Sequence, residues 1–457
     1  MKRKLLSAVI IAVMTLAGSK PAAAQQRYIV RTTGGLNSVL NLCLSANCQV
    51  QGSLDGPIGQ TYLVTTTSNI LQTLVGGVVN LLEALLGIKS VEPDQLLPMP
   101  LPPINNAPYG LTDTTPMNYF GTAVTHGYAA QPAGQIIRLT DAQKGFGVTG
   151  AGIVAVIDTG VDIYHPVLVP VLLPGYDFTR NQPGASEWLD MQNGNQNQNG
   201  NSQGQQPCAL QQESAAILDQ ESAAILDGPP CGAFGHGTMT SGVVHLVAPN
   251  AKILPLKAFS SNGTGYLSNI IAALYYAVQH NANVVNMSFD LSTPSSALSQ
   301  AASYANHANV VLLAAAGNED TSARVYPAAL NGKVMGIAST TNWDARSSFS
   351  NYGSADVWIG APGEYVISTF PGGGYAAASG TSFSSPLAAG TAALLLNAKS
   401  GLNQSQAASA LSHGRLLTPD LNHGRLDAYQ AISAWVNTSS SSGSTSSSSG
   451  SCFLLCL

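Results

Sequence analysis

An aspartate, a histidine and a serine each stand in a short motif rich in small residues. Asp158 ends an apolar run in VIDTG, His236 lies between two glycines in GHGT, and Ser382 lies in GTSFSSP ahead of an almost uncharged stretch. A serine hydroxyl becomes a nucleophile when a histidine takes its proton, and a carboxylate can orient the imidazole ring. Together, these three residue types could carry out acyl transfer.

Each motif also has a plainer interpretation. DTG could be half of an aspartic protease dyad, but that chemistry needs two carboxylates sharing a proton and no second DTG or DSG occurs. A lone serine at a helix start is usually an N-cap, as Ser382 could be. A core histidine usually lies among bulky residues, whereas the glycines beside His236 allow another backbone to approach closely.

The elements that must position these residues follow an α/β pattern. Short runs rich in Val and Ile alternate with helical stretches, which predicts a doubly wound, mostly parallel sheet with buried strands. The expected strands are 153–157, 252–256, 283–286, 310–316 and 334–337. Ligands bind at the carboxyl ends of such strands, where Asp158 lies and where Asn318 follows in AAAGN. The Asn318 amide could donate to a developing oxyanion there.

The segment before this pattern predicts a separate small module. Residues 25 to about 95 indicate strands and helices in the order βαββαβ. Residues 96–103 carry four prolines, which favours an extended linker over an element of a core.

The first residues predict export from the cytoplasm. Three basic residues precede an apolar run over 5–17, and Ala22, Ala23 and Ala24 follow, as in a secretory signal peptide cleaved after Ala24. No later window holds 18 uninterrupted apolar residues, so we expect no membrane span and an extracellular or periplasmic location.

Composition narrows the class of partner. The 457 residues are 45% hydrophobic, only 9% charged and include 46 glycines, which fits a packed fold better than disorder. With a net charge of −5 and no basic stripe, nucleic acid is not an expected partner. No CxxC or HExxH motif occurs, so no zinc site is expected.

Six cysteines fit an oxidising compartment and fall into three local pairs. The pairs are Cys43 with Cys48, Cys208 with Cys231, and Cys452 with Cys456. Residues 192–206 consist mainly of Asn, Gln and Gly, and QESAAILD follows twice, at 212–219 and 220–227. We interpret residues 179–231 as an inserted surface loop, closed at its neck by a disulfide between Cys208 and Cys231.

Taken together, VIDTGVD, GHGTMTSG, AAAGNED and GTSFSSP resemble the subtilisin-like serine proteases, in that family's chain order Asp, His, Ser. The resemblance covers roughly residues 135–436. It implies that Ser382 is the nucleophile and His236 the general base and then acid. It further implies that Asp158 orients the imidazole and that Asn318 donates to the oxyanion with the Ser382 backbone N–H.

The resemblance also implies a substrate cleft that pairs with an extended peptide. Its two edges would be Gly263, Thr264 and Gly265 on one side and Ser288, Phe289 and Asp290 on the other. Asp290 departs from the glycine common in relatives, which bears on the shape of the nearby subsites. Val325, where relatives have a smaller residue, is expected to make the pocket for the side chain before the scissile bond shallow.

The resemblance further implies a monomeric protease made as a precursor, which its own propeptide inhibits. The expected domains are a signal peptide 1–24, a propeptide and linker 25–115, a catalytic domain 116–436 and a Ser-rich tail 437–457. No cofactor is expected for catalysis. The strong calcium site of many relatives is expected to be absent, because Val167 stands where they have a ligating Asp and the helix after His236 lacks their inserted loop.

Two competing functions remain open at this point. A catalytically inactive peptide-binding protein could use the same fold, since fold alone does not establish activity. An esterase would be expected to carry a G-x-S-x-G elbow, but Ser384 stands at the second glycine position after Ser382.

Overall fold

One large sheet and the helices packed on it position the candidate residues. The computed structural model describes residues 25–75, 79–99, 109–192 and 232–438. Within these residues, every strand pair of the sheet is parallel except that of β9 with β10. In sheet order the strands are β10 (Gln182–Pro183), β9 (Tyr176–Asp177), β11 (Lys252–Lys257), β8 (Ile153–Asp158), β13 (Val284–Met287), β14 (Val311–Ala315), β15 (Met335–Thr340) and β16 (Ile359–Pro362). The predicted mostly parallel α/β fold is confirmed.

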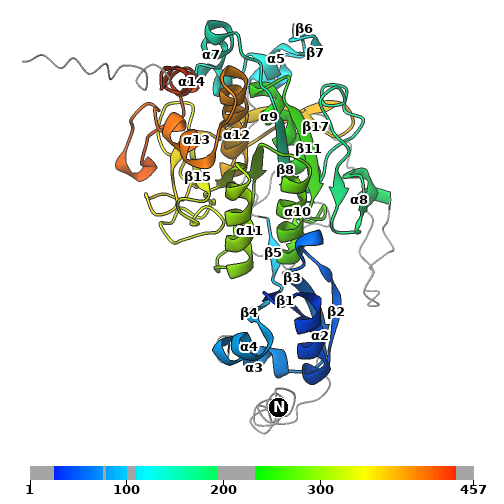
Figure 1. Ribbon diagram of the computed structural model, residues 1–457. Helices are drawn as coiled ribbons and strands as arrows, with labels where there is room; N and C mark the ends of the chain where they lie inside the picture. Colours follow the sequence, from blue (N-terminus) through cyan, green and yellow to red (C-terminus); the bar gives the residue numbers. More distant parts are fainter. Residues whose placement is uncertain (1–24, 76–78, 100–108, 193–231, 439–457) are drawn as a thin grey trace, which may run out of the picture.

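Helices cover both faces of this sheet (Figure 1). Along β8, Val154 and Val156 belong to the core cluster that includes α9 (His236–Val247) and α12 (Thr381–Ala398). Ala155 and Ile157 belong to the opposite cluster, with α10 (Leu267–Gln279) and α11 (Ser296–His307). A strand buried on both faces needs apolar side chains at consecutive positions, which is the pattern that the sequence showed.

The amino-terminal residues form a second, smaller sheet in the order β2-β3-β1-β4, below the large one in Figure 1. The chain order is the expected βαββαβ, with the second helical stretch divided in two. The elements are β1 (Gln26–Thr32), α2 (Gly35–Ala46), β2 (Cys48–Ser53), β3 (Thr61–Thr66), α3 (Ile70–Leu74), α4 (Val79–Leu86) and β4 (Ile88–Pro93). We call residues 25–93 the N-terminal module. The expected Cys43–Cys48 disulfide joins α2 to β2.

The residues after this module correct one expectation. Residues 96–103 were expected to be a linker outside any core, but β5 (Leu96–Pro98) pairs antiparallel with β12 (Thr264–Tyr266). The side chains of Leu97 and Met99 are buried in the same cluster as α10 and α11. A two-stranded pairing tolerates a proline whose nitrogen faces away from its partner, so proline content alone did not exclude a strand.

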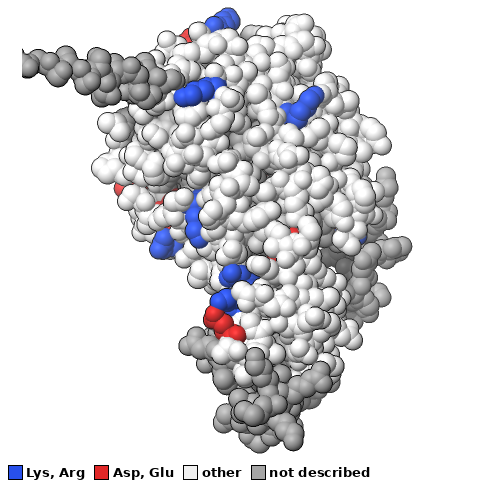
Figure 2. Space-filling model, viewed as in Figure 1, with Lys and Arg blue, Asp and Glu red and all other residues white. Residues whose placement is uncertain are grey.

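Shorter elements complete the described chain. They are η1 (Gly56–Ile58), η2 (Tyr109–Thr112), β6 (Pro116–Tyr119), β7 (Thr122–Thr125), α5 (His126–Ala129), α6 (Pro132–Ile136), α7 (Leu139–Phe146), α8 (Trp188–Gln192), β17 (Val366–Phe370), β18 (Gly374–Ala378), α13 (Gln404–Leu411), η3 (Pro419–Leu421) and α14 (Ala428–Asn437). In these described segments, no helix has the length and hydropathy needed to cross a bilayer. On the face in Figure 2, charged side chains are sparse and scattered.

Several expectations concern residues that the structure does not describe. They are the signal peptide, residues 193–231 of the expected insert with the Cys208–Cys231 pair, and residues 439–457 of the Ser-rich tail with Cys452 and Cys456. These expectations stay predictions. The same holds for the domain boundaries. Residues 179–192 of the expected insert are described and are not a surface loop, because Gln182–Pro183 forms β10 of the large sheet and Glu187 is buried.

Candidate active site

The four residues predicted to do chemistry are positioned at strand ends and helix starts. Asp158 is the last residue of β8, and Asn318 follows β14. His236 is the first residue of α9, and Ser382 is the second residue of α12. In a parallel sheet the strand carboxyl ends and the following helix amino termini share one edge, which brings these groups to one place.

Asp158 and His236 are hydrogen-bonded to each other. Oδ1 of Asp158 lies 2.7 Å from Nδ1 of His236, and both side chains are buried. Oδ2 accepts from the Thr240 hydroxyl at 3.0 Å, and Oδ1 also accepts from the Thr159 backbone N–H at 2.7 Å. Because a carboxylate fixed in this way accepts the Nδ1 proton, the lone pair of the imidazole is directed to Nε2.

Nε2 of His236 is therefore free to take a proton. It is buried, and no described residue offers it a hydrogen bond. Oγ of Ser382 donates instead to the carbonyl oxygen of Ser288 at 3.2 Å. Catalytic hydrogen bonds are often loose without substrate and tighten when it binds, so this arrangement is compatible with a serine nucleophile.

Asn318 is held by one end of its amide. Its Oδ1 accepts from the Thr381 backbone N–H at 2.9 Å and from the Thr381 hydroxyl at 3.0 Å. Its Nδ2 is buried and has no hydrogen-bond partner among the described residues. A buried donor without an acceptor is costly, and a negatively charged oxygen would satisfy it. The backbone N–H of Ser382, in the first turn of α12, has no intrahelical acceptor and is a second donor.

The residues expected to form the substrate edges belong to two separate segments. Thr264 and Gly265 form part of β12, whose pairing is taken up by β5, and the Gly263 carbonyl oxygen accepts from the Met99 N–H at 2.7 Å. In the other segment, Ser288 contacts Ser382 through its carbonyl oxygen. The ring of Phe289 is fully buried and packs 5.1 Å from that of Phe259, so this side chain belongs to the core rather than to the cleft.

Asp290 and Val325 belong to adjoining segments, because Leu291 and Tyr326 exchange two backbone hydrogen bonds of 2.7 and 2.8 Å. Burial, and next the nearby Glu319 carboxylate, raise the pKa of Asp290 to about 8. Oδ2 of Asp290 has no partner within the described part of the chain. The Val325 side chain is buried, with only 7% of the residue exposed, and occupies volume beside this segment.

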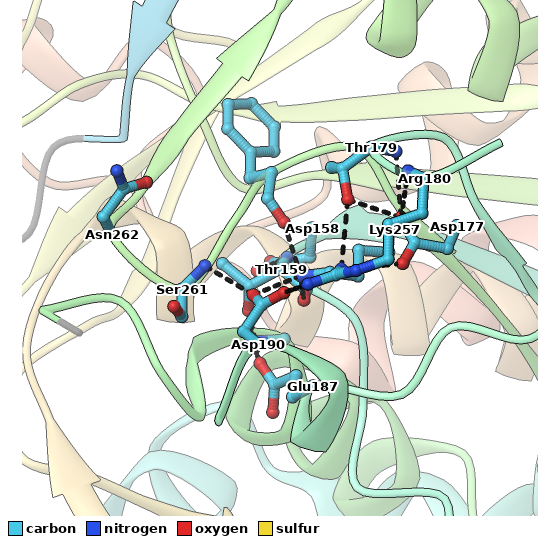
Figure 3. A network of polar contacts seen from close by, with 12 residues as sticks. Asp158, Thr159, Asp177, Thr179, Arg180, Glu187, Asp190, Lys257, Ser261 and Asn262 are labelled. Carbon is cyan, nitrogen blue, oxygen red and sulfur yellow. Dashed lines mark hydrogen bonds and ion pairs between the residues drawn. The ribbon is translucent and has the colours of Figure 1, made fainter. Parts of the chain in front are cut away.

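Glu187 is a residue that the sequence analysis missed. It lies just before α8, is 1% exposed and stands in the polar network of Figure 3 next to Thr159. Burial first, opposed by hydrogen bonds from Thr159 and Thr238, raises its pKa to about 7. The sequence signal was a single carboxylate with no motif around it, which could not be told from a surface residue.

The structure also bears on metal binding. In the described ranges no group of three or more His, Cys, Asp and Glu side chains could hold a metal ion. Val167 is buried in the core cluster of α9 and α12. The absence of the strong calcium site stays a prediction.

The sequence of this chain is similar to those of known proteins. The family model described as the subtilase family, peptidase S8, matches residues 150–429, more than half of the chain. The thermophilic serine proteinase of a Bacillus species is 32% identical over 61% of this chain and 61% of its own length. Thermitase from Thermoactinomyces vulgaris is 31% identical over 61% of this chain and 88% of its own.

A solved structure gives the same fold. The crystal structure of a lanthipeptide protease matches with a TM-score of 0.52 and 22% identity, over 66% of this chain and 95% of that one. At this level of identity the likeness shows the fold alone. The family model and the thermitase match carry the assignment, and the chain belongs to the subtilase family of serine proteases.

Proposed function

We propose that this subtilase hydrolyses peptide bonds through Ser382, His236 and Asp158, with Asn318 stabilising the oxyanion. One observation carries the proposal. Nε2 of His236 and Nδ2 of Asn318 are both buried without a partner among the described residues, while the opposite end of each side chain is held by hydrogen bonds. During acyl transfer, Nε2 of His236 would accept the serine proton, and Nδ2 of Asn318 would donate a hydrogen bond to the oxyanion.

The chemistry proceeds in two halves. Oγ of Ser382 attacks the scissile carbonyl carbon while its proton moves to Nε2 of His236, and Asp158 stabilises the imidazolium. The carbonyl oxygen becomes an oxyanion that accepts from Nδ2 of Asn318 and the Ser382 N–H. The C–N bond breaks as Nε2 protonates the leaving amine. Water then attacks the acyl-enzyme, gives a proton to Nε2, and the serine is released as Oγ takes that proton back.

The way β5 binds supports recognition of an extended polypeptide. Three residues, Leu96 to Pro98, pair with Tyr266 to Thr264, and the next N–H, of Met99, bonds to Gly263. A substrate strand added to the same edge would use the same backbone groups, which is recognition by β-augmentation. We therefore place the substrate chain along residues 263–265.

Further contacts of the N-terminal residues support a self-inhibited precursor. Glu92 accepts from the Ser296 and Ala297 N–H groups, each at 3.0 Å, at the start of α11. Asp94 accepts from the Ser268 N–H at 2.8 Å at the start of α10. Carboxylates at helix amino termini are stabilised by the helix dipole and by the unpaired N–H groups. In this proposal, the described residues between 25 and 99 dock against the starts of α10 and α11 and occupy the edge at 263–265 where substrate would bind.

Synthesis with a cleaved signal peptide and export from the cytoplasm complete the proposal. They rest on the sequence pattern of residues 1–24. The alternative is an inactive peptide-binding protein, which would present the same cleft and bind peptides without cleaving them.

Incubation of the purified chain with a peptide library separates the two functions. We expect cleavage products from the wild type and intact peptides from the Ser382→Ala variant, since no acyl-enzyme forms without the hydroxyl. N-terminal sequencing of the wild type would locate the maturation site. Binding of intact peptides by the wild type, without any cleavage after removal of the N-terminal module, would favour the inactive alternative.

A further inference from the structure

Glu187 joins the strand that carries Asp158 to the helix that carries His236. Its Oε1 accepts from the Thr159 hydroxyl and from the Gly237 N–H, the latter at 3.2 Å. Its Oε2 accepts from the Thr238 hydroxyl at 2.5 Å. The donors are the residue after Asp158 and the two residues after His236. One buried carboxylate is therefore shared by both halves of the Asp158–His236 pair.

Direct bonds between the same segments make this connection rigid. The Gly237 N–H also donates to the Thr159 hydroxyl oxygen at 2.9 Å. The Thr238 hydroxyl oxygen accepts from the Asp162 N–H at 2.7 Å. Each threonine hydroxyl thus accepts a hydrogen bond from a backbone N–H and donates its own hydrogen bond to Glu187. Removing the carboxylate would leave the two buried hydroxyl donors without their acceptor and would take away one of the two acceptors of the Gly237 N–H, and the segments would have to shift to satisfy the hydroxyls.

Glu187 differs from the nearby Asp190 in the charges of its hydrogen-bond partners (Figure 3). Lys257 is fully buried, and its Nζ donates to the Thr159 carbonyl oxygen at 2.6 Å and to Asp190 at 2.8 Å. Asp190 also pairs with Arg180 and accepts from the Ser261 N–H at 2.7 Å. Lys257 favours the ionised form of Glu187, and the Asp158 carboxylate disfavours it. Asp190 is thus balanced by two cations, whereas the direct partners of Glu187 are neutral hydroxyl and N–H donors.

We propose that Glu187 is a positioning residue for the reaction, which keeps Asp158 and His236 at the right distance and orientation to each other. It does so by accepting hydrogen bonds from Thr159, Gly237 and Thr238. It does not touch the substrate. The inference rests on the proposed function, because it assigns a role within the same hydrolytic site. It goes beyond that function because it assigns part of the control of the site's geometry to a residue outside the four motifs.

Kinetics of three variants of the full chain test this role after maturation. Glu187→Gln keeps the shape but replaces one acceptor by a donor, and Glu187→Ala removes both acceptors. We expect kcat to fall on the order of tenfold in the first and a hundredfold in the second, because small misplacements of catalytic groups have effects of that size. KM should stay within about twofold, since the substrate edge at 263–265 does not contact Glu187.

Asp190→Asn is the matched control. It weakens a buried ion pair in the same network without changing any contact of Thr159 Oγ1, Gly237 N or Thr238 Oγ1. We expect it to lower the unfolding midpoint at least as much as Glu187→Gln, while kcat stays within about threefold of the wild type. An unchanged kcat in both Glu187 variants would overturn the proposal. So would kcat losses that merely follow the loss of thermal stability across all three variants.

A spectroscopic measurement keeps this test separate from that of the proposed function. In the Ser382→Ala background, which needs no activity, the downfield proton NMR signal of the His236 Nδ1–H bonded to Asp158 reports on the pair directly. We expect this signal to broaden or disappear in Glu187→Ala and to persist in Asp190→Asn. Its persistence in Glu187→Ala would overturn the positioning role. A wild type that cleaves no peptide would refute the proposed function and leave this arm to decide on Glu187.

Discussion

The backbone N–H of Met99 donates to the carbonyl oxygen of Gly263 at 2.7 Å, next to the β5–β12 pairing. The chain therefore places its own residues on the edge where we propose that substrate binds. Since backbone pairing of this kind is independent of side-chain identity, the segment and a substrate would compete for the same groups.

The first prediction concerns release of this inhibition. Glu92→Gln should weaken docking of the N-terminal module, because it removes the charge that caps α11, an effect of about 1 kcal/mol or severalfold in affinity. Activity should appear earlier after purification, which a continuous peptide assay would measure. Glu83→Gln is the control, since Glu83 is an exposed residue of the same module whose partner is Lys89. Equal time courses for the two variants would count against the role of Glu92.

The second prediction concerns the pocket for the side chain before the scissile bond. Val325→Gly should enlarge it and raise kcat/KM for peptides with Phe or Tyr at that position, relative to peptides with Ala. The expected change in transition-state binding free energy is roughly 1 to 3 kcal/mol. The wild type should favour small or medium apolar residues. Competing cleavage of paired peptides gives the ratio directly. A wild type that already prefers Phe, or a variant with the wild-type ratio, would show that Val325 does not limit the pocket.

The third prediction concerns stability in acid. Burial lowers the pKa of His245 to about 4, and its Nδ1 lies 3.0 Å from the hydroxyl of buried Tyr128. Below pH 6.5, His245 binds a proton in the unfolded chain but stays neutral in the folded chain. The free energy of unfolding therefore falls as the pH drops from 6.5 to 4. The loss is about 3 kcal/mol, and above pH 6.5 the group contributes no pH dependence.

Urea unfolding of the Ser382→Ala chain, with and without His245→Gln, checks this loss. The free-energy advantage of His245 over Gln should shrink between pH 7 and pH 4.5. The exposed residue His280 supplies a control variant, His280→Gln, in which an imidazole is removed from the surface. A constant difference between His245 and Gln over that range would contradict the prediction.

The fourth prediction concerns calcium. Because Val167 offers no side-chain oxygen where relatives have a carboxylate, removal of calcium with EDTA should change the unfolding midpoint little. Differential scanning calorimetry with and without EDTA measures this change. A fall of more than about 10 °C, on the order of 2 kcal/mol or more, would reveal a strong site.

The sequence predicted the strand ends well and the connections between distant segments poorly. Asp158 and Asn318 could be placed because each follows an apolar run whose burial on both faces is visible locally. Glu187 could not, because its partners Thr159 and Thr238 lie 28 and 51 residues away and only the fold brings them together. Residues 96–98 were interpreted as a linker because a pairing with Thr264–Tyr266 leaves no periodic signal in so short and proline-rich a segment.

The central claim is that Ser382 is a nucleophile activated by His236, and covalent labelling tests it most directly. The mature chain would be treated with an organophosphonate that reacts with activated serines, and the adduct located by peptide mass spectrometry. We predict one adduct per chain, on Ser382, with matching loss of peptide cleavage, and labelling slowed at least a thousandfold in His236→Ala. An unlabelled Ser382 in a chain that still cleaves peptides would contradict the account, as would labelling that does not depend on His236.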